Sequence, residues 1–313
     1  MRSGRVTTRP DPSTVLLPGP WEHRAISANG IRLHVAECGQ GPLVVLLHGF
    51  PEFWWAWRHQ LTGLAQAGFR AVAVDLRGYG DSDKPPRGYD LWTLAGDVAG
   101  LIRALGERSA TVVGHGWGGL IGWTVTALHP RLVRSLVVLG APHPLGLRRE
   151  VLRHPRAQGR ATLSHALGFQ LPLWPERALT ADGAELVRRV MRDWSAPRWA
   201  ATQEFAEVVE HNRRAMLVPT VAHCALEYYR WGLRSQLRAE GRRFAAGVGR
   251  PVEVPVLQIH GVADPCVLPS TALASQRWAG TQARFELLDE VGHFPHHESP
   301  TGTTDLITRF LAS

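Results

Sequence analysis

The chain has 313 residues, which is more than one compact domain usually holds, so we expect two domains or one large fold with an insertion. Hydrophobic residues make up 44% and charged residues 20%, a balance that can fill a large core and excludes a disordered chain. The three cysteines are far apart, which excludes a disulfide scaffold and fits a reducing, cytoplasmic location.

The formal net charge of +8 raises the question of a nucleic-acid partner. Lys84 is the only lysine, so 34 of the 35 basic residues are arginine, a bias typical of a GC-rich genome. The arginines are scattered and form no basic stripe with interleaved aromatic residues, so we expect no nucleic-acid partner. No apolar run reaches the roughly 18 residues that a membrane span needs, so we also expect no membrane association. A homodimer is left open.

The predicted elements begin with an extended tail at 1–20, where four prolines exclude an amphipathic targeting helix. Strands and helices then alternate, and the unbroken apolar run at 43–47 is typical of a strand buried on both faces. Strands are predicted at 21–28, 31–37, 43–47, 70–74, 110–113, 136–139, 254–259 and 284–288, and helices at about 54–67, 91–105, 118–129, 270–278 and 302–312. This order predicts an α/β fold with a mostly parallel central sheet flanked by helices.

The alternation stops between the sixth and seventh predicted strands. Residues 145–245 show no strand-like run, only helical patterns broken by prolines. We therefore expect a sheet domain formed by 21–144 and 246–313, interrupted by a helical cap at 145–245.

Motifs follow the carboxyl ends of the strands, where open parallel sheets bind ligands. His-Gly-Phe-Pro-Glu stands at 48–52 and Asp-Leu-Arg-Gly-Tyr-Gly-Asp-Ser at 75–82. Gly-His-Gly-Trp-Gly-Gly stands at 114–119, and Asp264 and His293 follow the last two strands. Together these motifs resemble the α/β-hydrolase fold and, within it, the epoxide hydrolase and haloalkane dehalogenase branch, especially its actinobacterial epoxide hydrolases. The resemblance covers about residues 21–312.

The resemblance implies a covalent mechanism for opening an epoxide. A nucleophilic aspartate on a sharp turn between strand and helix forms an ester with the substrate, and a histidine then drives water onto that ester. His293 matches the histidine and Asp264 the acid that orients it, while the backbone N–H groups of Phe50 and Trp117 match the oxyanion hole. The position of the nucleophile falls on Gly116.

The cap also carries the resemblance. The segment around Tyr229 matches the one whose tyrosine hydrogen-bonds the epoxide oxygen, and the second such tyrosine of the family falls on His165. The expected ligand is small and apolar or epoxide-like, in a pocket lined by His48, Pro51, Trp54, Trp117, His165 and Tyr229. Tyr229 as an ordinary core aromatic residue stays open as an alternative.

Gly116 is expected to affect the fold and the function differently. The turn forces its central residue toward positive φ, which glycine accepts without strain, so the turn is kept while the attacking carboxylate is lost. We therefore expect the covalent reaction to be impaired or absent, which makes the chain a candidate pseudoenzyme with an incomplete triad. Two functions remain open: a hydrolase in which His293 activates water directly, and a non-catalytic binding or sensor protein.

Two other sequence patterns bear on a nucleotide cofactor and on a metal ion. Gly114, Gly116 and Gly119 spell the dinucleotide-binding fingerprint, but no carboxylate ends the next strand to hold a ribose, so we expect no nucleotide cofactor. His293, His296 and His297 lack the carboxylate or cysteine spacing of a metal site, so we expect no metal.

Overall fold

An eight-stranded sheet organises the computed structural model, which describes residues 10–313 apart from the side chains of residues 163–165. Its strands are β1 (Glu22–Ala28), β2 (Ile31–Cys38), β3 (Leu43–Leu47), β4 (Arg70–Val74), β5 (Ala110–His115), β6 (Val133–Leu139), β7 (Val256–Gly261) and β8 (Ala283–Leu288). They lie in the order β1-β2-β4-β3-β5-β6-β7-β8. β2 is antiparallel to both of its neighbours, and β3 to β8 run parallel, which confirms the predicted sheet.

The central strands are buried on both faces, as their unbroken apolar sequence predicts. Every residue of β3, β5 and β7 is buried. In the register of the sheet, Leu47 of β3 faces Gly114 of β5, and Gly114 faces Val138 of β6. The carboxyl ends of these strands therefore meet at one edge of the sheet.

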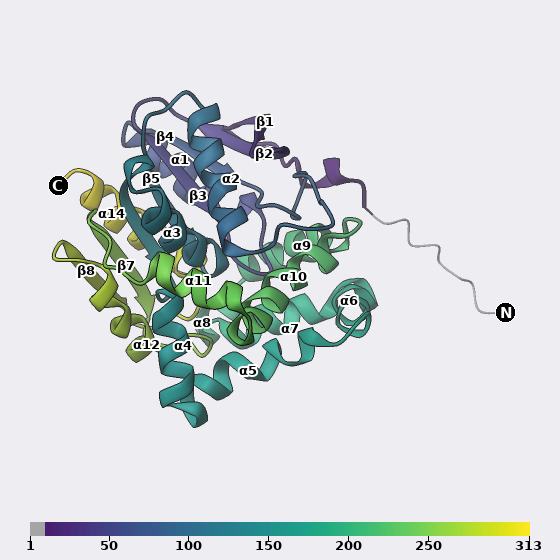
Figure 1. Ribbon diagram of the computed structural model, residues 1–313. Coiled ribbons are helices and arrows are strands. Elements are labelled where there is room, and N and C mark those ends of the chain that lie inside the picture. The colour runs from purple at the N-terminus through teal and green to yellow at the C-terminus, as the bar shows by residue number, and fades with distance from the viewer. Residues whose placement is uncertain (1–9) are drawn as a thin grey trace.

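Helices on both sides cover the sheet (Figure 1). These are α1 (Arg58–Gln66), α2 (Leu91–Ala104), α3 (Trp117–Leu128), α12 (Pro269–Leu273), α13 (Pro295–Glu298) and α14 (Pro300–Leu311). Asp90 caps α2, since its side chain accepts a hydrogen bond from the Thr93 N–H. The predicted strand at 254–259 begins two residues later than expected because Pro255 has no N–H to donate to a ladder.

Between β6 and β7 the described chain forms helices and no strand. They are α4 (Pro144–Arg153), α5 (Arg160–Ala166), α6 (Trp174–Thr180), α7 (Glu185–Trp194), α8 (Pro197–Ala200), α9 (Gln203–Leu217), α10 (Val221–Arg234) and α11 (Ala239–Val248). Prolines that break the sequence pattern stand in the first turn of α4, α6 and α8, where a missing N–H costs nothing. Figure 1 shows these teal to green helices gathered beside the sheet. Over residues 10–313 we find no helix with the length and apolar character of a membrane span.

The buried side chain at the start of α4 makes stability depend on pH. His143 caps α4 by accepting from the Leu145 N–H, and its ring stacks on Trp278 at 4.5 Å. Burial lowers the pKa of His143 from 6.5 to about 3. The unfolded chain therefore binds a proton below pH 6.5 that the folded chain does not bind until about pH 3.

We predict that His143→Asn, which keeps a capping side chain, weakens the acid dependence of stability. The contribution of His143 is complete above pH 6.5 and declines as the pH falls toward about 3, by about 1.4 kcal/mol per pH unit. Urea titrations at pH 7, 6 and 5 should therefore show a free energy of unfolding that declines less steeply in the variant. Parallel slopes in the two proteins would contradict the prediction.

Candidate active site

A sharp turn joins β5 to α3 at the carboxyl edge of the sheet. Its central residue, Gly116, has φ +51° and ψ −116°, the left-handed side of the map that strains residues with a Cβ. A Cβ built there would lie 3.6 Å from the Gly49 Cα and 3.8 Å from the His293 Nε2. Among the described residues no acid or hydroxyl comes within 4 Å of that position. The turn is therefore formed without a side chain at its centre.

The other glycines of this motif allow close packing of the backbone. A Cβ at Gly114 would lie 2.3 Å from the Gly118 carbonyl oxygen, and one at Gly118 would lie 2.1 Å from the Leu47 carbonyl oxygen. A Cβ at Gly119 would lie 2.3 Å from the Ala141 Cβ. Contacts between strand and helix thus account for the glycine spacing without a nucleotide.

His293 and Asp264 form a buried pair opposite Gly116. The His293 Nδ1 lies 2.8 Å from the Asp264 Oδ2, and the other Asp264 oxygen accepts from the N–H groups of Cys266 and Val267. Burial alone would lower the pKa of His293, but the charge and hydrogen bond of Asp264 outweigh it and raise that pKa. Burial likewise would raise the pKa of Asp264, yet His293 holds it below its ordinary value. The pair therefore favours an imidazolium beside a carboxylate.

The backbone donors expected at the oxyanion hole come from two adjacent strand ends. Phe50 follows β3, and Trp117 is the first residue of α3 after β5. Within residues 10–313, neither amide N–H donates to another protein group. The bond between Phe50 and Pro51 is a cis peptide.

Aromatic rings from the helices between β6 and β7 lie beside these groups. Tyr229 of α10 lies 5.4 Å from Phe50, 5.2 Å from Trp117 and 5.1 Å from Phe169 between ring centroids. Burial raises the pKa of the Tyr229 hydroxyl. Trp194, at the end of α7, lies 5.4 Å from the His293 ring. The site thus lies where the strand ends meet the helices between β6 and β7, and its lining is aromatic except for the groups around Gly116.

Two residues that were expected to line the ligand pocket, His48 and Trp54, are instead packed inside the core. His48 is fully buried, with its Nδ1 donating to the Gly49 carbonyl and its Nε2 accepting from the Leu76 N–H. Trp54 is also fully buried and contacts Trp21 and His23 of the N-terminal segment, away from Gly116. His165 belongs to α5, and its side chain lies outside the described residues.

Sequence reasoning gave no role to a buried acid and the three histidines around it. The carboxylate of Glu52 accepts from the His115 Nδ1 at 2.7 Å, the His296 Nε2 at 2.9 Å and the His297 Nε2 at 3.0 Å. All four side chains have no exposed surface. Glu52 lies in the motif at 48–52 and His115 in the motif at 114–119. Their membership in these motifs is the sequence signal that could have identified them as functional residues.

The His115 ring joins this cluster to the pair of His293 and Asp264. Its Nδ1 faces the Glu52 carboxylate and its Nε2 faces the His293 carbonyl oxygen at 2.9 Å. Both ring nitrogens of His115 thus face hydrogen-bond acceptors, one on each side of the ring. Burial alone would raise the pKa of Glu52, but the charge and hydrogen bonds of the histidines hold it well below its usual range. Glu52 and His115 thus fix the backbone of the loop that carries His293.

Three of these side chains lie close enough to share an ion. The ligand atoms of Glu52, His115 and His296 all lie within 4.8 Å of one another. These atoms already satisfy one another as donors and acceptors, and Arg58 donates to His297 beside them. The group is therefore a hydrogen-bond network around Glu52, in which the buried His296 Nδ1 has no partner among the described residues. It differs from the trio of His293, His296 and His297 that was weighed from the sequence.

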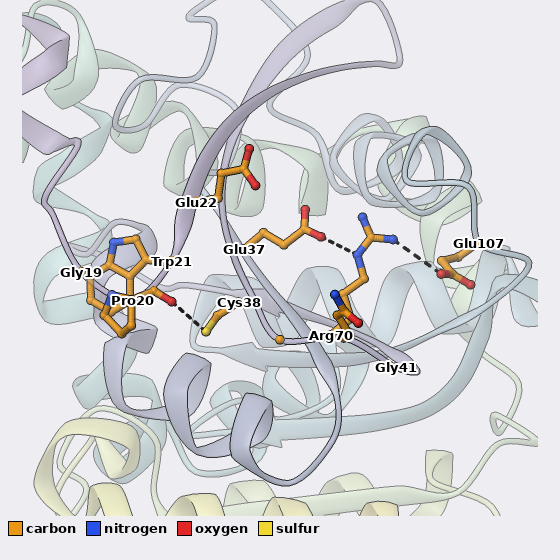
Figure 2. Close-up of a pocket in the computed structure, with 11 residues that line it drawn as sticks. Gly19, Pro20, Trp21, Glu22, Glu37, Cys38, Gly41, Arg70 and Glu107 are labelled. Atoms are coloured by element: carbon orange, nitrogen blue, oxygen red, sulfur yellow. Dashed lines mark hydrogen bonds and ion pairs between the residues drawn. The ribbon is translucent and has the colours of Figure 1, made fainter.

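A surface cavity of about 680 Å³ lies at the opposite edge of the sheet (Figure 2). Its lining includes Gly41 before β3, Arg70 at the start of β4 and Glu107 before β5, which are the amino ends of the parallel strands. Three of its charged residues are paired, since Glu37 accepts from Arg70 and from Arg24, and Arg70 also forms an ion pair with Glu107. Since ligands of such sheets bind at the carboxyl ends, this cavity is not the catalytic site.

Comparisons with known proteins agree with this geometry. A family described as the alpha/beta hydrolase fold matches residues 42–300. The chain belongs to the α/β-hydrolase fold family. It is 32% identical to the AB hydrolase superfamily protein YfhM of Bacillus subtilis, over 91% of this chain and 96% of that protein. It is also 32% identical to epoxide hydrolase 3 of Xenopus tropicalis, over 90% of this chain and 75% of that protein.

Solved structures give the same result for this α/β-hydrolase fold protein. Epoxide hydrolase A of Mycobacterium thermoresistibile superposes with a TM-score of 0.80 at 28% identity, covering 94% of this chain and 98% of that one. An epoxide hydrolase from an endophytic Streptomyces superposes with a TM-score of 0.79 at 28% identity, covering 94% and 96%. The chain is therefore an epoxide hydrolase-like α/β-hydrolase.

Proposed function

We propose that this protein binds a small apolar epoxide or epoxide-like ligand between core and cap but lacks the nucleophile of the covalent reaction. The relatives named as epoxide hydrolases support the ligand class. The aromatic contacts of Tyr229, Phe50 and Trp117 support an apolar site next to Gly116.

The observation that carries the proposal is the environment of Gly116. A nucleophile must come within bonding distance of a ligand carbon, and an adjacent base must activate it. No acid or hydroxyl of the described residues comes within 4 Å of the Cβ position, whereas the base candidate His293 does. The chain therefore keeps the group that would activate water and lacks the group that would attack the epoxide.

The remaining roles follow from the same geometry. His293 acts as the general base on a water molecule, Asp264 orients its ring, and Tyr229 donates to the epoxide oxygen. The N–H groups of Phe50 and Trp117 serve as the oxyanion hole, and residues 145–245 serve as the lid. Direct attack by water is slow, because the covalent route exists to divide one difficult step into two easier ones. A binding or sensor protein is the second candidate, which the loss of the attacking carboxylate favours.

Isotope labelling tests this proposal. When the protein is mixed in excess with an aryl epoxide in H₂¹⁸O, we predict that diol from the first turnover carries ¹⁸O, since the oxygen comes directly from water. A covalent route would give unlabelled first-turnover diol, because that oxygen would come from the protein. Intact-mass spectra should show no adduct, and tryptophan fluorescence should show saturable binding of the epoxide. An adduct, or fast formation of unlabelled diol, would overturn the proposal.

A further inference from the structure

The space beside Gly116 is surrounded by hydrogen-bond donors. A carbon at the Cβ position meets only the Gly49 Cα and the His293 Nε2 within 4 Å, both at ordinary contact distances. His293 is 96% buried, and no described residue accepts a hydrogen bond from its Nε2. This buried nitrogen therefore faces a space with no partner for it.

Two backbone donors border the same space. The Trp117 N–H is the first of α3, a helix of 12 residues, and the positive end of a helix favours an anion. Phe50 follows Gly49, whose Cα lies 3.6 Å from the Cβ position, and its N–H has no acceptor within the described chain. Three donors without a protein acceptor among the described residues thus lie in the segments that border Gly116.

The charges around this space also favour an anion. Asp264 is hydrogen-bonded to His293 and raises the pKa of that ring, which favours the imidazolium. The carboxylate of Glu52 is hydrogen-bonded to the rings of His115, His296 and His297. The negative charges nearby are therefore already paired, and the Nε2–H and the two N–H groups are available.

We propose that the space beside Gly116 binds a small free carboxylate, formate above all, which supplies the attacking oxygen that the chain lacks. This inference rests on the proposed function, since it concerns the same site and the same epoxide. A free carboxylate cannot approach the Gly116 Cα as closely as a bonded side chain does, because non-bonded carbons rest about 3.5 Å apart. The anion therefore lies slightly farther out, and affinity falls from formate to acetate to propionate.

This arrangement permits a reaction in which formate opens the epoxide and is then regenerated. A formate oxygen attacks one epoxide carbon, the C–O bond of the epoxide breaks, and the ring oxygen takes the Nε2 proton of His293, which gives the formate ester of a diol and a neutral imidazole. Water then loses a proton to that imidazole and attacks the ester carbonyl, held by the N–H groups of Phe50 and Trp117. The tetrahedral intermediate passes its own O–H proton to the departing diol oxygen, so that diol and formate are released and His293 is protonated again. The net change is epoxide plus water to diol.

Binding can be measured without any epoxide. Carbon-13 NMR and calorimetry with ¹³C-formate should show saturable binding to the wild-type protein. Gly116→Asp should bind none, because its own carboxylate fills the space. Gly68→Asp is the matched control, since Gly68 also has positive φ and open space around its Cβ position but lies at the end of α1. It should bind formate like the wild type. Equal binding to Gly116→Asp, or no saturable binding at all, overturns the proposal.

The role of formate as the nucleophile is tested by the rate of diol formation and by the transfer of an oxygen label. Formate should accelerate diol formation by the wild type and by Gly68→Asp by about tenfold or more, because a held nucleophile gains from proximity. With [¹⁸O]formate, the label should appear in the diol. Binding without acceleration or label transfer overturns the nucleophilic role.

If Gly116→Asp hydrolyses the epoxide while formate leaves the wild type unchanged, this inference fails and the proposed function stands. If the wild type without formate is as fast as Gly116→Asp, the proposed function itself fails.

Discussion

Gly116→Asp is expected to raise epoxide hydrolysis by at least about a thousandfold over the wild type, measured as kcat/KM for an aryl epoxide. The new side chain begins 3.8 Å from the His293 Nε2, so its ester would lie within reach of water activated by that base. The position has φ +51°, so aspartate is strained there, and we expect a loss of stability of about 1–3 kcal/mol. Gain of activity together with loss of stability is the signature of a strained catalytic residue.

Three further variants make this result specific. Gly116→Asn has the same shape without a nucleophilic carboxylate and should stay at the wild-type rate. Gly68→Asp introduces the same charge at another positive-φ glycine and should also leave the rate unchanged. Gly116→Asp combined with His293→Phe should accumulate the ester, seen as an intact-mass increase equal to the epoxide. If Gly116→Asp folds but its rate matches that of Gly116→Asn, the absence of a nucleophile at this position does not explain the function.

Most of the sheet could be predicted because its sequence signals are local. The apolar runs at 43–47 and 70–74 became β3 and β4 with those same bounds, since strands buried on both faces need continuous apolar sequence. Asn29-Gly30 gave the hairpin between β1 and β2, where both residues have positive φ. The position of Gly116 between β5 and α3 was likewise readable from the glycine spacing.

The three-dimensional partners of single side chains could not be predicted in the same way. Trp54 follows a strand end like the site residues, but its indole nitrogen donates to the Val15 carbonyl, a partner 39 residues away. His296 and His297 look like an exposed loop pair in the sequence and instead are buried against Glu52, more than 240 residues away. Such pairings depend on which strand ends meet, and neither periodicity nor spacing reports that. The position of Gly116, by contrast, could be predicted from the motif at 114–119 alone.

Glu52→Gln is expected to destabilise the protein by about 3–5 kcal/mol in urea titrations at pH 7. The buried carboxylate accepts from three histidines and from the Gly49 N–H. An amide offers one oxygen in place of two and adds donors where His115, His296 and His297 already donate. Burial lowers the pKa of His296 to about 4, so that ring stays neutral at pH 7, and the substitution leaves the buried donors of His115, His296 and His297 without their carboxylate acceptor.

Glu298→Gln is the matched control for this substitution. Glu298 is also largely enclosed, but it accepts from the backbone N–H groups of Gly292, Ala196 and Phe294 and faces no charged ring in its hydrogen bonds. The same change should therefore cost only about 1–2 kcal/mol there. Because His115 donates to the His293 carbonyl, the loss at Glu52 should also slow Gly116→Asp when the two substitutions are combined, mainly through kcat. Equal destabilisation by the two glutamine variants would mean that the three histidine donors do not set Glu52 apart from Glu298, and the link between the Glu52 cluster and the loop of His293 would then rest on packing alone.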